Sequence, residues 1–377
     1  MASPTSGIVD IHTHMYPPSY VEIMEKRTTI PIVRKFPQAS DPRLILLEEE
    51  VKSLEDALKD PQAKVPGRPL TTHYSSVQQK IHFMDTHGIR KSVVSLANPW
   101  LDFLDASESP AIAKKINDEF SDLCGQYPRR LFFFAALPLT ASLEDILSSV
   151  EHVRGLKYCR GVILGTSGLG KGLDDPRLLP VYKALAEAKL PIFLHPHYGL
   201  PSEVWGDRAG EYGHVLPLAL GFPMETTIAV TRMFLSGVFD EVRELQIILA
   251  HSGGTLPFLA GRIESCVVHD GQLLREGKLA KSRRTVWDVL KEQIYLDAVV
   301  YSPTSLKLAA ESSGADRVMF GTDHPFFPPL ETDEQGEWES VTWNTAAIRK
   351  ATEGKSAETE AILGGNATRV LRLDEEF

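Results

Sequence analysis

Two histidines separated by one residue carry the strongest chemical signal in the sequence. They stand at the end of an apolar run in the segment VDIHTH, as His12 and His14. Side chains two positions apart in a β-strand point to the same side, so the two imidazoles can face one metal ion. Taken alone, this pattern is equally compatible with two polar residues that leave a strand for a loop.

Two further apolar runs end in residues that bind metals. The run from Pro191 to Leu194 leads into His195, and the run from Val318 to Gly321 leads through a threonine into Asp323. Three imidazoles and one carboxylate form a donor set that suits Zn²⁺ and leaves room for a water or a substrate. The sequence therefore predicts a zinc site made by His12, His14, His195 and Asp323.

A further histidine ends another apolar run and is followed by glycines that let the backbone approach a ligand closely. This residue is His251, in the segment LAHSGG. It could itself bind the metal. We expect it instead to hydrogen-bond Asp323 or a bound water and to control the position of a proton, because the four residues above already nearly fill the coordination sphere.

The elements that must position these residues are eight short apolar runs of strand character. They span residues 8–11, 92–96, 131–136, 161–164, 191–194, 247–250, 294–296 and 318–321. Continuous apolar runs are typical of strands buried on both faces of a parallel sheet, and the intervening segments are long enough for crossover helices, among them 141–154 and 179–188. An eightfold β-then-α alternation predicts an α/β fold of the (β/α)8 TIM barrel type, which gathers the ends of distant strands; a doubly wound open sheet is the alternative.

Two connections are too long for a simple crossover. Residues 17–70 and 197–221 are expected to form insertions over the barrel mouth, within a single domain that spans residues 1–377. A third segment, the glycine-rich loop 165–172, does not fit the phosphate-binding pattern GxxxxGK[ST], because Gly172 follows Lys171. Nucleotide binding is therefore not expected.

Composition excludes several classes of protein. The chain has 40 basic and 50 acidic residues and a net charge of −10, which disfavours a nucleic-acid partner. Its three cysteines form no CxxC pair, and no stretch approaches the length of about 18 apolar residues that a membrane span requires. We therefore expect a soluble, cytoplasmic protein whose partner is a small molecule, with no membrane association.

The full set of motifs resembles the amidohydrolase superfamily, and within it the metal-dependent decarboxylases typified by aminocarboxymuconate semialdehyde decarboxylase. The likeness runs from HxH through the strand-end histidine, HSGG and GTDHP to the G-N-A segment at 365–367. The strings LANPW, KYCRGVILGTSGLGKGLDDP, LGFPMETTIAV and LAHSGGTLPFLAGRIES resemble the fungal isoorotate (uracil-5-carboxylate) decarboxylases. By matching position, the resemblance implies the same four metal ligands and His251 as the base beside them. Binuclear members of the superfamily use a lysine at the end of the fourth strand, which this chain lacks, so we expect one Zn²⁺ per subunit.

Five residues are candidates for binding the substrate. Arg68 and Asn98 could donate hydrogen bonds, and Phe222 and Phe326 could sandwich a planar ring. Arg262 stands where related enzymes use an arginine that crosses a subunit boundary to hold a substrate anion, which implies a homodimer or larger assembly; a surface arginine paired with an acid is the alternative.

The resemblance implies a carboxy-lyase that converts 5-carboxyuracil into uracil and CO₂. In this hypothesis the substrate carboxylate and ring carbonyl bind the metal, Asp323 protonates the ring carbon, and His251 regulates that proton. A rival enzyme activity is hydrolysis of a lactone or amide by zinc-bound hydroxide. A metal-binding protein without catalysis is a third possibility, and ranks last because closed structural sites are usually rich in cysteine.

Overall fold

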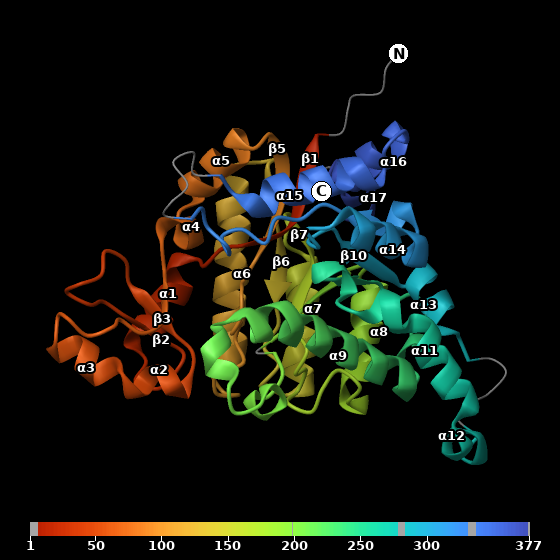
Figure 1. Cartoon of the computed structure of the whole chain (residues 1–377), viewed down its shortest axis with the longest axis horizontal. Helices are drawn as coiled ribbons and strands as arrows, with labels where there is room; N and C mark the ends of the chain where they lie inside the picture. Colours follow the sequence, from red (N-terminus) through yellow and green to blue (C-terminus); the bar gives the residue numbers. More distant parts are fainter. Residues whose placement is uncertain (1–6, 198, 278–282, 331–336, 376–377) are drawn as a thin grey trace.

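Eight parallel strands form the centre of the molecule (Figure 1). The computed structural model describes residues 7–197, 199–277, 283–330 and 337–375. The strands of the main sheet are β1 (Ile8–His14), β5 (Ile89–Ser95), β6 (Leu131–Ala136), β7 (Cys159–Gly165), β8 (Ile192–His195), β9 (Ile247–Leu249), β10 (Ile294–Asp297) and β11 (Val318–Met319). Each predicted apolar run thus forms a strand.

The sheet curls into a nearly closed barrel. Its strands follow one another in chain order from β1 to β11, and all neighbours are parallel. Its two edges meet where the Ile11 amide donates to the Phe320 carbonyl at 3.1 Å and where Thr13 pairs with His324. This architecture confirms the predicted (β/α)8 barrel and places the carboxyl ends of all eight strands at one mouth.

Helices cover the outside of the barrel (Figure 1). The longer ones are α1 (Pro18–Lys26), α5 (Val77–Thr86), α6 (Ser109–Gly125), α7 (Leu143–Arg154), α8 (Leu179–Glu187), α9 (Phe222–Ser236), α11 (Leu256–His269), α13 (Val286–Glu292), α14 (Pro303–Ser313) and α15 (Glu339–Ala351). The shorter ones are α2 (Glu48–Lys52), α3 (Leu54–Lys59), α4 (Thr72–Ser75), α10 (Val238–Glu241), α12 (Gly271–Arg275), α16 (Ser356–Glu360) and α17 (Asn366–Val370). The predicted helix at 141–154 begins at Leu143, because Ser142 caps it by accepting a hydrogen bond from the Asp145 amide at 3.2 Å.

One strand begins earlier than its apolar run suggested. β5 starts at Ile89 rather than residue 92, and it includes Lys91, which is 5% exposed. The Lys91 ammonium donates to the Leu373 carbonyl at 3.0 Å and pairs with Asp374, so the carboxyl-terminal segment neutralises a charge inside the strand. Because a charged residue interrupts the apolar run, the hydrophobicity pattern places the start of this strand too late.

The two long connections have structure of their own. Residues 17–70 contain a separate antiparallel sheet of β2 (Ile32–Arg34), β3 (Arg43–Ile45) and β4 (Arg68–Pro69). This sheet and α2–α3 project from one side of the barrel, at the left of Figure 1. Residues 199–221 of the second connection form short turns and a five-residue π-helix, Pro217–Gly221, that leads into α9.

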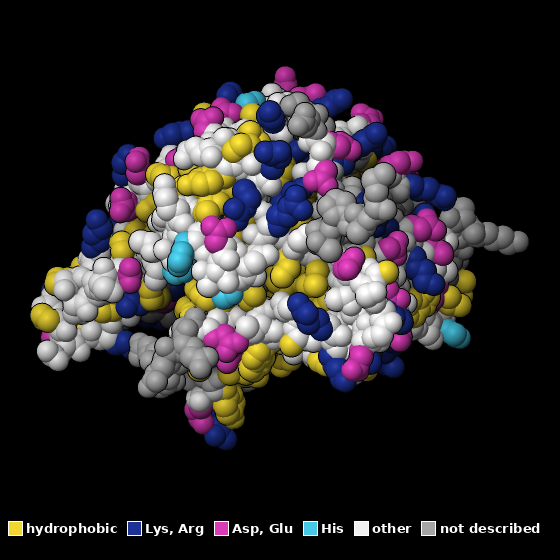
Figure 2. Space-filling view, turned by 90° about the horizontal axis from the view of Figure 1, so that it is seen from above, with side chains coloured by type: hydrophobic (Ala, Val, Ile, Leu, Met, Phe, Trp, Pro, Cys, Tyr) yellow, Lys and Arg dark blue, Asp and Glu magenta, His cyan; other side chains and the backbone are white. Residues whose placement is uncertain are grey.

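The surface carries both signs of charge. Seen from above, Lys and Arg side chains are interspersed with Asp and Glu side chains, with uncharged areas between them (Figure 2). Within the described ranges, no helix combines the length and apolar character needed to cross a bilayer.

Candidate metal centre

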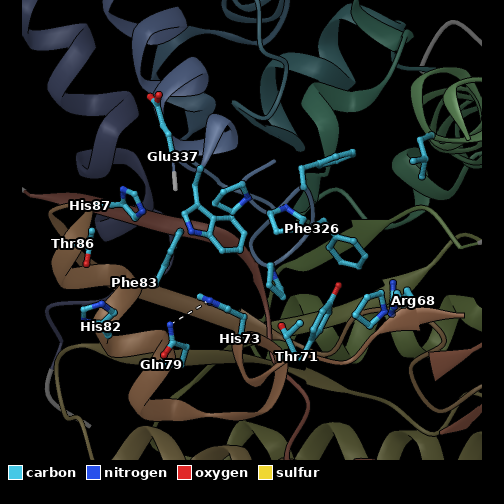
Figure 3. Close-up of a pocket in the computed structure, with 18 residues that line it drawn as sticks. Arg68, Thr71, His73, Gln79, His82, Phe83, Thr86, His87, Phe326 and Glu337 are labelled. Carbon is cyan, nitrogen blue, oxygen red and sulfur yellow. Dashed lines mark hydrogen bonds between the residues drawn. The ribbon is translucent and has the colours of Figure 1, made fainter. Parts of the chain in front are cut away.

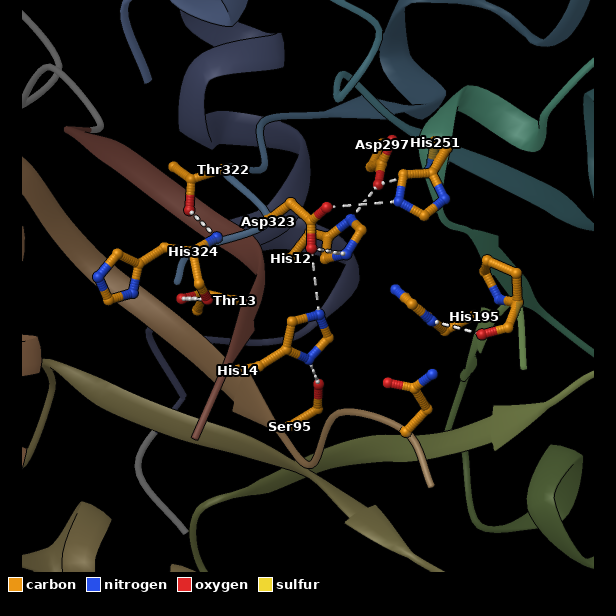
Figure 4. A network of polar contacts seen from close by, with 12 residues as sticks. His12, Thr13, His14, Ser95, His195, His251, Asp297, Thr322, Asp323 and His324 are labelled. Atoms are coloured by element: carbon orange, nitrogen blue, oxygen red, sulfur yellow. Dashed lines mark hydrogen bonds and ion pairs between the residues drawn. The ribbon is translucent and has the colours of Figure 1, made fainter. Parts of the chain in front are cut away.

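Four buried side chains converge at the mouth of the barrel (Figure 4). His12 and His14 come from β1, His195 ends β8, and Asp323 follows β11. One nitrogen or oxygen atom from each lies within 4.8 Å of the corresponding atoms of the others. The structure therefore brings together the four residues that the sequence predicts as metal ligands.

Each histidine is oriented by a contact of its other ring nitrogen. Nδ1 of His12 lies 2.6 Å from Asp297 Oδ2, Nδ1 of His14 lies 3.1 Å from Ser95 Oγ, and Nδ1 of His195 lies 2.9 Å from the Pro196 carbonyl. These contacts direct all three Nε2 atoms inward. A histidine that binds a metal characteristically donates its other N–H to such a partner.

The inward-facing atoms fit a metal ion. Within the described part of the chain, Nε2 of His12, His14 and His195 and Oδ1 of Asp323 are buried and have no hydrogen-bond partner. Buried polar atoms without partners are costly, and a cation would satisfy all four at once. Three imidazole nitrogens and one carboxylate oxygen also match the donors that Zn²⁺ accepts.

Burial keeps two of the three imidazoles neutral, as metal coordination requires. Burial lowers the pKa of His14 to about 4 and holds the pKa of His195 well below its ordinary value, so both rings are neutral and offer a lone pair. Burial also opposes the charged form of His12, but the Asp323 and Asp297 carboxylates outweigh it and raise the pKa of His12 to about 10. A metal ion would take the place of the proton on His12 Nε2.

Asp323 is held by its backbone in an uncommon conformation. Its φ angle is +58°, and its amide donates to the His12 carbonyl at 2.7 Å. Burial favours the neutral carboxyl, but His12, together with His14 and His251, outweighs burial and holds the pKa of Asp323 well below its ordinary value. Asp323 therefore carries a negative charge in the cluster.

His251 lies beside the cluster. Its Nε2 is 3.6 Å from Asp323 Oδ2, and its ring centroid lies 5.1 Å from that of His12 and 5.2 Å from that of His195. The distance to Asp323 is longer than a hydrogen bond. The hydrogen bond between His251 and Asp323 that the sequence predicts is therefore not formed at this distance, and the role of His251 in proton transfer stays a prediction.

A cavity of about 930 Å³ lies beyond the four cluster residues, none of which lines it (Figure 3). Two of the predicted substrate residues, Arg68 and Phe326, line it, and the Arg68 guanidinium lies 4.8 Å from the Phe326 ring centroid. The Phe326 ring in turn contacts the His14 ring edge, with 5.6 Å between centroids. Arg68 donates to Tyr16 Oη at 2.5 Å, and its buried Nε has no partner within the described residues.

The other three predicted substrate residues do not line this cavity, although the Asn98 carbonyl accepts a hydrogen bond from Arg68 Nη2 at 3.4 Å. Asn98 is buried, and its amide donates to the His197 carbonyl at 2.8 Å, so it links two loops of the mouth. Phe222 begins α9 and packs over Gly199. Arg262 is exposed on the outer side of α11.

Three residues that position the site were not identified from the sequence. Asp297 contacts His12, Glu225 accepts hydrogen bonds from Thr166 Oγ1 and from two amides of the loop after His195, and the buried Lys80 donates to Thr13 Oγ1 and His324 Nδ1 at 2.6 Å each. A signal existed for Lys80: it shares the buried face of α5 with apolar residues at helical spacing. Asp297 also stood at the end of a predicted strand.

Comparison with known proteins agrees with this geometry. The model of the amidohydrolase family matches residues 9–373. The structure of IDCase in apo form from Metarhizium anisopliae has 69% sequence identity and a TM-score of 0.95, with 100% of both chains covered. Gamma-resorcylate decarboxylase of Rhizobium sp. (strain MTP-10005) is 29% identical, covering 86% of this chain and 97% of the relative. The 2-amino-3-carboxymuconate-6-semialdehyde decarboxylase of Dictyostelium discoideum is 26% identical, covering 97% and 92%. A chain matched over nearly its whole length in this way belongs to the amidohydrolase family.

Proposed function

We propose that this protein is a metal-dependent decarboxylase that converts 5-carboxyuracil (isoorotate) into uracil and CO₂. The observation that carries the proposal is the buried set of three imidazole nitrogens and one carboxylate oxygen that have no hydrogen-bond partner among the described residues and lie close enough together for one ion, with Nε2 of His12 and His14 at 3.2 and 3.4 Å from Asp323 Oδ1. The cavity lined by Arg68 lies beyond Phe326, which contacts His14. The 69% identity to IDCase over the whole chain supports isoorotate as the substrate. The decarboxylases among the other relatives support the reaction class.

The reaction replaces a ring carboxylate by a proton. A C–H bond forms at the ring carbon, the bond from that carbon to the carboxylate breaks, and its electron pair restores the conjugated ring as CO₂ leaves. When bound, the metal would supply Lewis-acid polarisation of the substrate carboxylate and the neighbouring carbonyl. Protonating the ring carbon before CO₂ leaves avoids a vinylic carbanion.

Asp323 is the proposed proton donor. Its low pKa means that it is ionised before the substrate binds, so a proton must reach it during turnover. His251 is placed to deliver that proton, because its Nε2 lies 3.6 Å from the Asp323 carboxylate. We assign catalytic roles to these two residues and metal binding to His12, His14, His195 and Asp323.

The substrate ring is proposed to bind between the cluster and the cavity wall. Arg68 supplies a cation whose Nε has no partner within the described chain, and Phe326 supplies an aromatic face next to His14. Asn98, in the loop after β5, and Phe222, at the start of α9, are proposed to border the same mouth. A planar acid fits these partners, because its ring can stack while its carboxylate and carbonyl remain in the plane.

We further propose one Zn²⁺ per chain and an assembly of at least two chains. Zinc suits the nitrogen-rich donor set, although imidazole and carboxylate also bind other divalent metals. The dimer rests on Arg262, which is exposed on α11 one turn beyond Phe258, a residue that is 76% exposed. A partner that covers this face would bury Phe258 and receive Arg262. The free thiols of Cys124, Cys159 and Cys266 support a reducing compartment, the cytoplasm.

Incubation of the metal-analysed protein with 5-carboxyuracil tests the function. The proposal expects uracil and CO₂ in equal amounts, with no product after chelation. Lactones and amides without a carboxylate serve in parallel, because a hydrolase using the same ligands would cleave them. Cleavage of these compounds without CO₂ release would establish the hydrolase, and bound metal without any turnover would leave a metal-binding protein.

A further inference from the structure

The carboxylate of Asp297 lies behind the metal cluster, at the carboxyl end of β10. Its side chain is fully buried, and it does not line the cavity of about 930 Å³ described above. Its Oδ2 accepts from His12 Nδ1 at 2.6 Å and from the His251 amide at 3.0 Å. One oxygen atom therefore joins a proposed metal ligand to the backbone of the proposed proton carrier (Figure 4).

The other carboxylate oxygen holds the same segment. Asp297 Oδ1 accepts from the Ser252 amide at 2.8 Å and from the Val299 amide at 3.0 Å. The Ser252 hydroxyl closes the contact by donating to the Asp297 carbonyl at 2.7 Å. All of these donors are N–H or O–H groups, so the site requires a pure acceptor.

The segment held in this way has an uncommon backbone. His251 and Ser252 both have a φ of +53°, a left-handed conformation that residues with a side chain rarely adopt. Such a conformation persists only where the surrounding structure holds it. The two amides of this pair are the ones that donate to the Asp297 carboxylate.

We propose that Asp297 is a positioning residue that couples the metal site to His251. Its carboxylate fixes Nδ1–H of His12, which leaves Nε2 for the metal, and it simultaneously holds the His251 backbone in the conformation that faces Asp323. Metal binding fixes His12, His12 fixes the carboxylate, and the carboxylate orders residues 251–252. This inference rests on the proposed metal site and adds a residue to which the sequence assigned no role.

Replacement of Asp297 by asparagine would break this link without changing the size of the side chain. An asparagine has one acceptor oxygen and one NH₂ group, so in either orientation its NH₂ faces N–H donors. It cannot serve His12 and His251 on one side and Ser252 and Val299 on the other. The variant therefore separates the acceptor function of Asp297 from its shape.

Hydrogen exchange in the unaltered protein tests the coupling directly. The amides of residues 251–252 are compared in zinc-loaded and chelated protein by mass spectrometry of overlapping peptides. The amides of Val300 and Tyr301, which donate to the buried Asn344 at 3.2 and 2.9 Å, serve as an internal reference. We expect chelation to speed exchange at 251–252 at least several-fold and to leave 300–301 unchanged. Equal exchange at 251–252 with and without metal would overturn the proposal.

The Asp297→Asn variant tests the functional consequence of the coupling between the metal site and His251. We expect zinc to bind about 10- to 100-fold more weakly and kcat to remain reduced at saturating zinc, because His251 is no longer held. The exchange at 251–252 should be fast with and without metal. Asn344→Ala, which removes a buried acceptor in α15 for the amides of Val300 and Tyr301, should change neither zinc affinity nor the response of 251–252. A normal kcat in zinc-saturated Asp297→Asn would contradict the positioning role.

The outcome also separates this inference from the proposed function. If the unaltered protein makes uracil and holds zinc but chelation does not affect 251–252, the function stands and the coupling is wrong. If the protein binds zinc, shows the coupling and makes no uracil, the function is wrong while the positioning role of Asp297 stands.

Discussion

The metal-facing residues owe their orientation to groups outside the cluster. His12, His14 and His195 each use Nδ1 for a contact with the protein, and this choice leaves Nε2 free to coordinate. The three partners differ in kind: a carboxylate, a hydroxyl and a backbone carbonyl. At the scale of single residues, the orientation of the three proposed metal ligands therefore depends on atoms outside the cluster.

Asp323→Asn should abolish turnover more completely than it removes metal. An amide oxygen can still coordinate, but an amide cannot deliver an acidic proton. We expect a loss of activity of at least about 100-fold, in the range given by removal of a general acid, with much of the zinc retained. His12→Ala is the comparison, since loss of one imidazole should release the metal itself. Near-normal turnover in fully loaded Asp323→Asn would exclude Asp323 as the proton donor.

Asp102, whose Oδ2 lies 3.4 Å from His197 Nε2, provides a pH-dependent test. Burial raises the pKa of this carboxyl from 3.8 to about 7. The folded protein therefore binds more protons than the unfolded chain between these values, and the stability that Asp102 contributes is lost as the pH rises through 7. Asp102→Asn should raise the melting temperature by about 2 °C at pH 8.5 and have little effect at pH 4. Equal shifts at both pH values would show that ionisation of Asp102 carries no cost.

The sequence identified the cluster but not its supporting residues. HxH, the strand-end His195 and Asp323 were visible because polar residues end apolar runs. Asp297 also ends such a run, but its contact with His12 depends on a fold that places residues 285 positions apart within 2.6 Å. Spacing along the sequence does not distinguish a strand-end residue that faces the metal from one that contacts the outer ring nitrogen of a metal-binding histidine.

The elements around the mouth are joined by side chains that bridge loops. Glu225 in α9 accepts from Thr166 Oγ1 after β7 and from the amides of His197 and Gly199 after β8. The same helix begins with Phe222. One carboxylate thus fixes the relative positions of three segments that border the proposed substrate site.

Glu225→Gln should loosen this junction. Glutamine keeps one acceptor oxygen but presents an NH₂ group to at least one of the backbone amides. Loss of a hydrogen bond to a charged group costs about 2 kcal/mol. We expect lower stability and a KM for the substrate that rises more than kcat falls, with zinc content unchanged. Exposed Glu244→Gln is the matched control, and a KM equal to that of the control would show that α9 does not position the substrate loop.

The hydrophobic pattern predicted which strands exist more accurately than where they begin and end. The eight strands were visible as apolar runs, whereas the start of β5 was hidden by Lys91 and its contact with the carboxyl-terminal segment. The small sheet of β2, β3 and β4 was also missed, because its strands are two or three residues long and carry no repeating pattern. Boundaries and short strands are set by tertiary contacts that a local pattern does not contain.

The whole molecule should respond to its metal as a single unit. The four proposed ligands join β1, β8 and the segment after β11, so a bound ion would connect strands across the barrel. A ligand that binds only the folded state adds stability according to its concentration and affinity. Chelation should therefore lower the melting temperature, and one equivalent of Zn²⁺ should restore it. An unchanged melting temperature would show that the cluster holds no metal in solution.

Assembly is tested by mixing two inactive chains. If Arg262 reaches the pocket of its partner, Arg262→Ala fails to hold the substrate anion and His12→Ala fails to hold metal. In a mixed dimer the His12→Ala chain lends its intact Arg262 to the metal site of the other chain, so one pocket is complete. Activity should reappear after subunit exchange, up to about a quarter of that of the unaltered protein if exchange is random and each dimer has two independent sites. No recovery after exchange confirmed by mass, or full activity as a monomer, would place Arg262 outside the neighbouring pocket.

A metal titration of uracil formation tests the central claim most directly. Chelated protein is supplied with 5-carboxyuracil, and uracil is measured as Zn²⁺ is added in steps, with Mn²⁺ in a parallel series. We predict a rate near zero without metal and a linear rise with zinc that ends at one equivalent per chain. Uracil formation that is independent of added metal in fully chelated protein, or a rise that continues to two equivalents, would contradict a single metal centre built from His12, His14, His195 and Asp323.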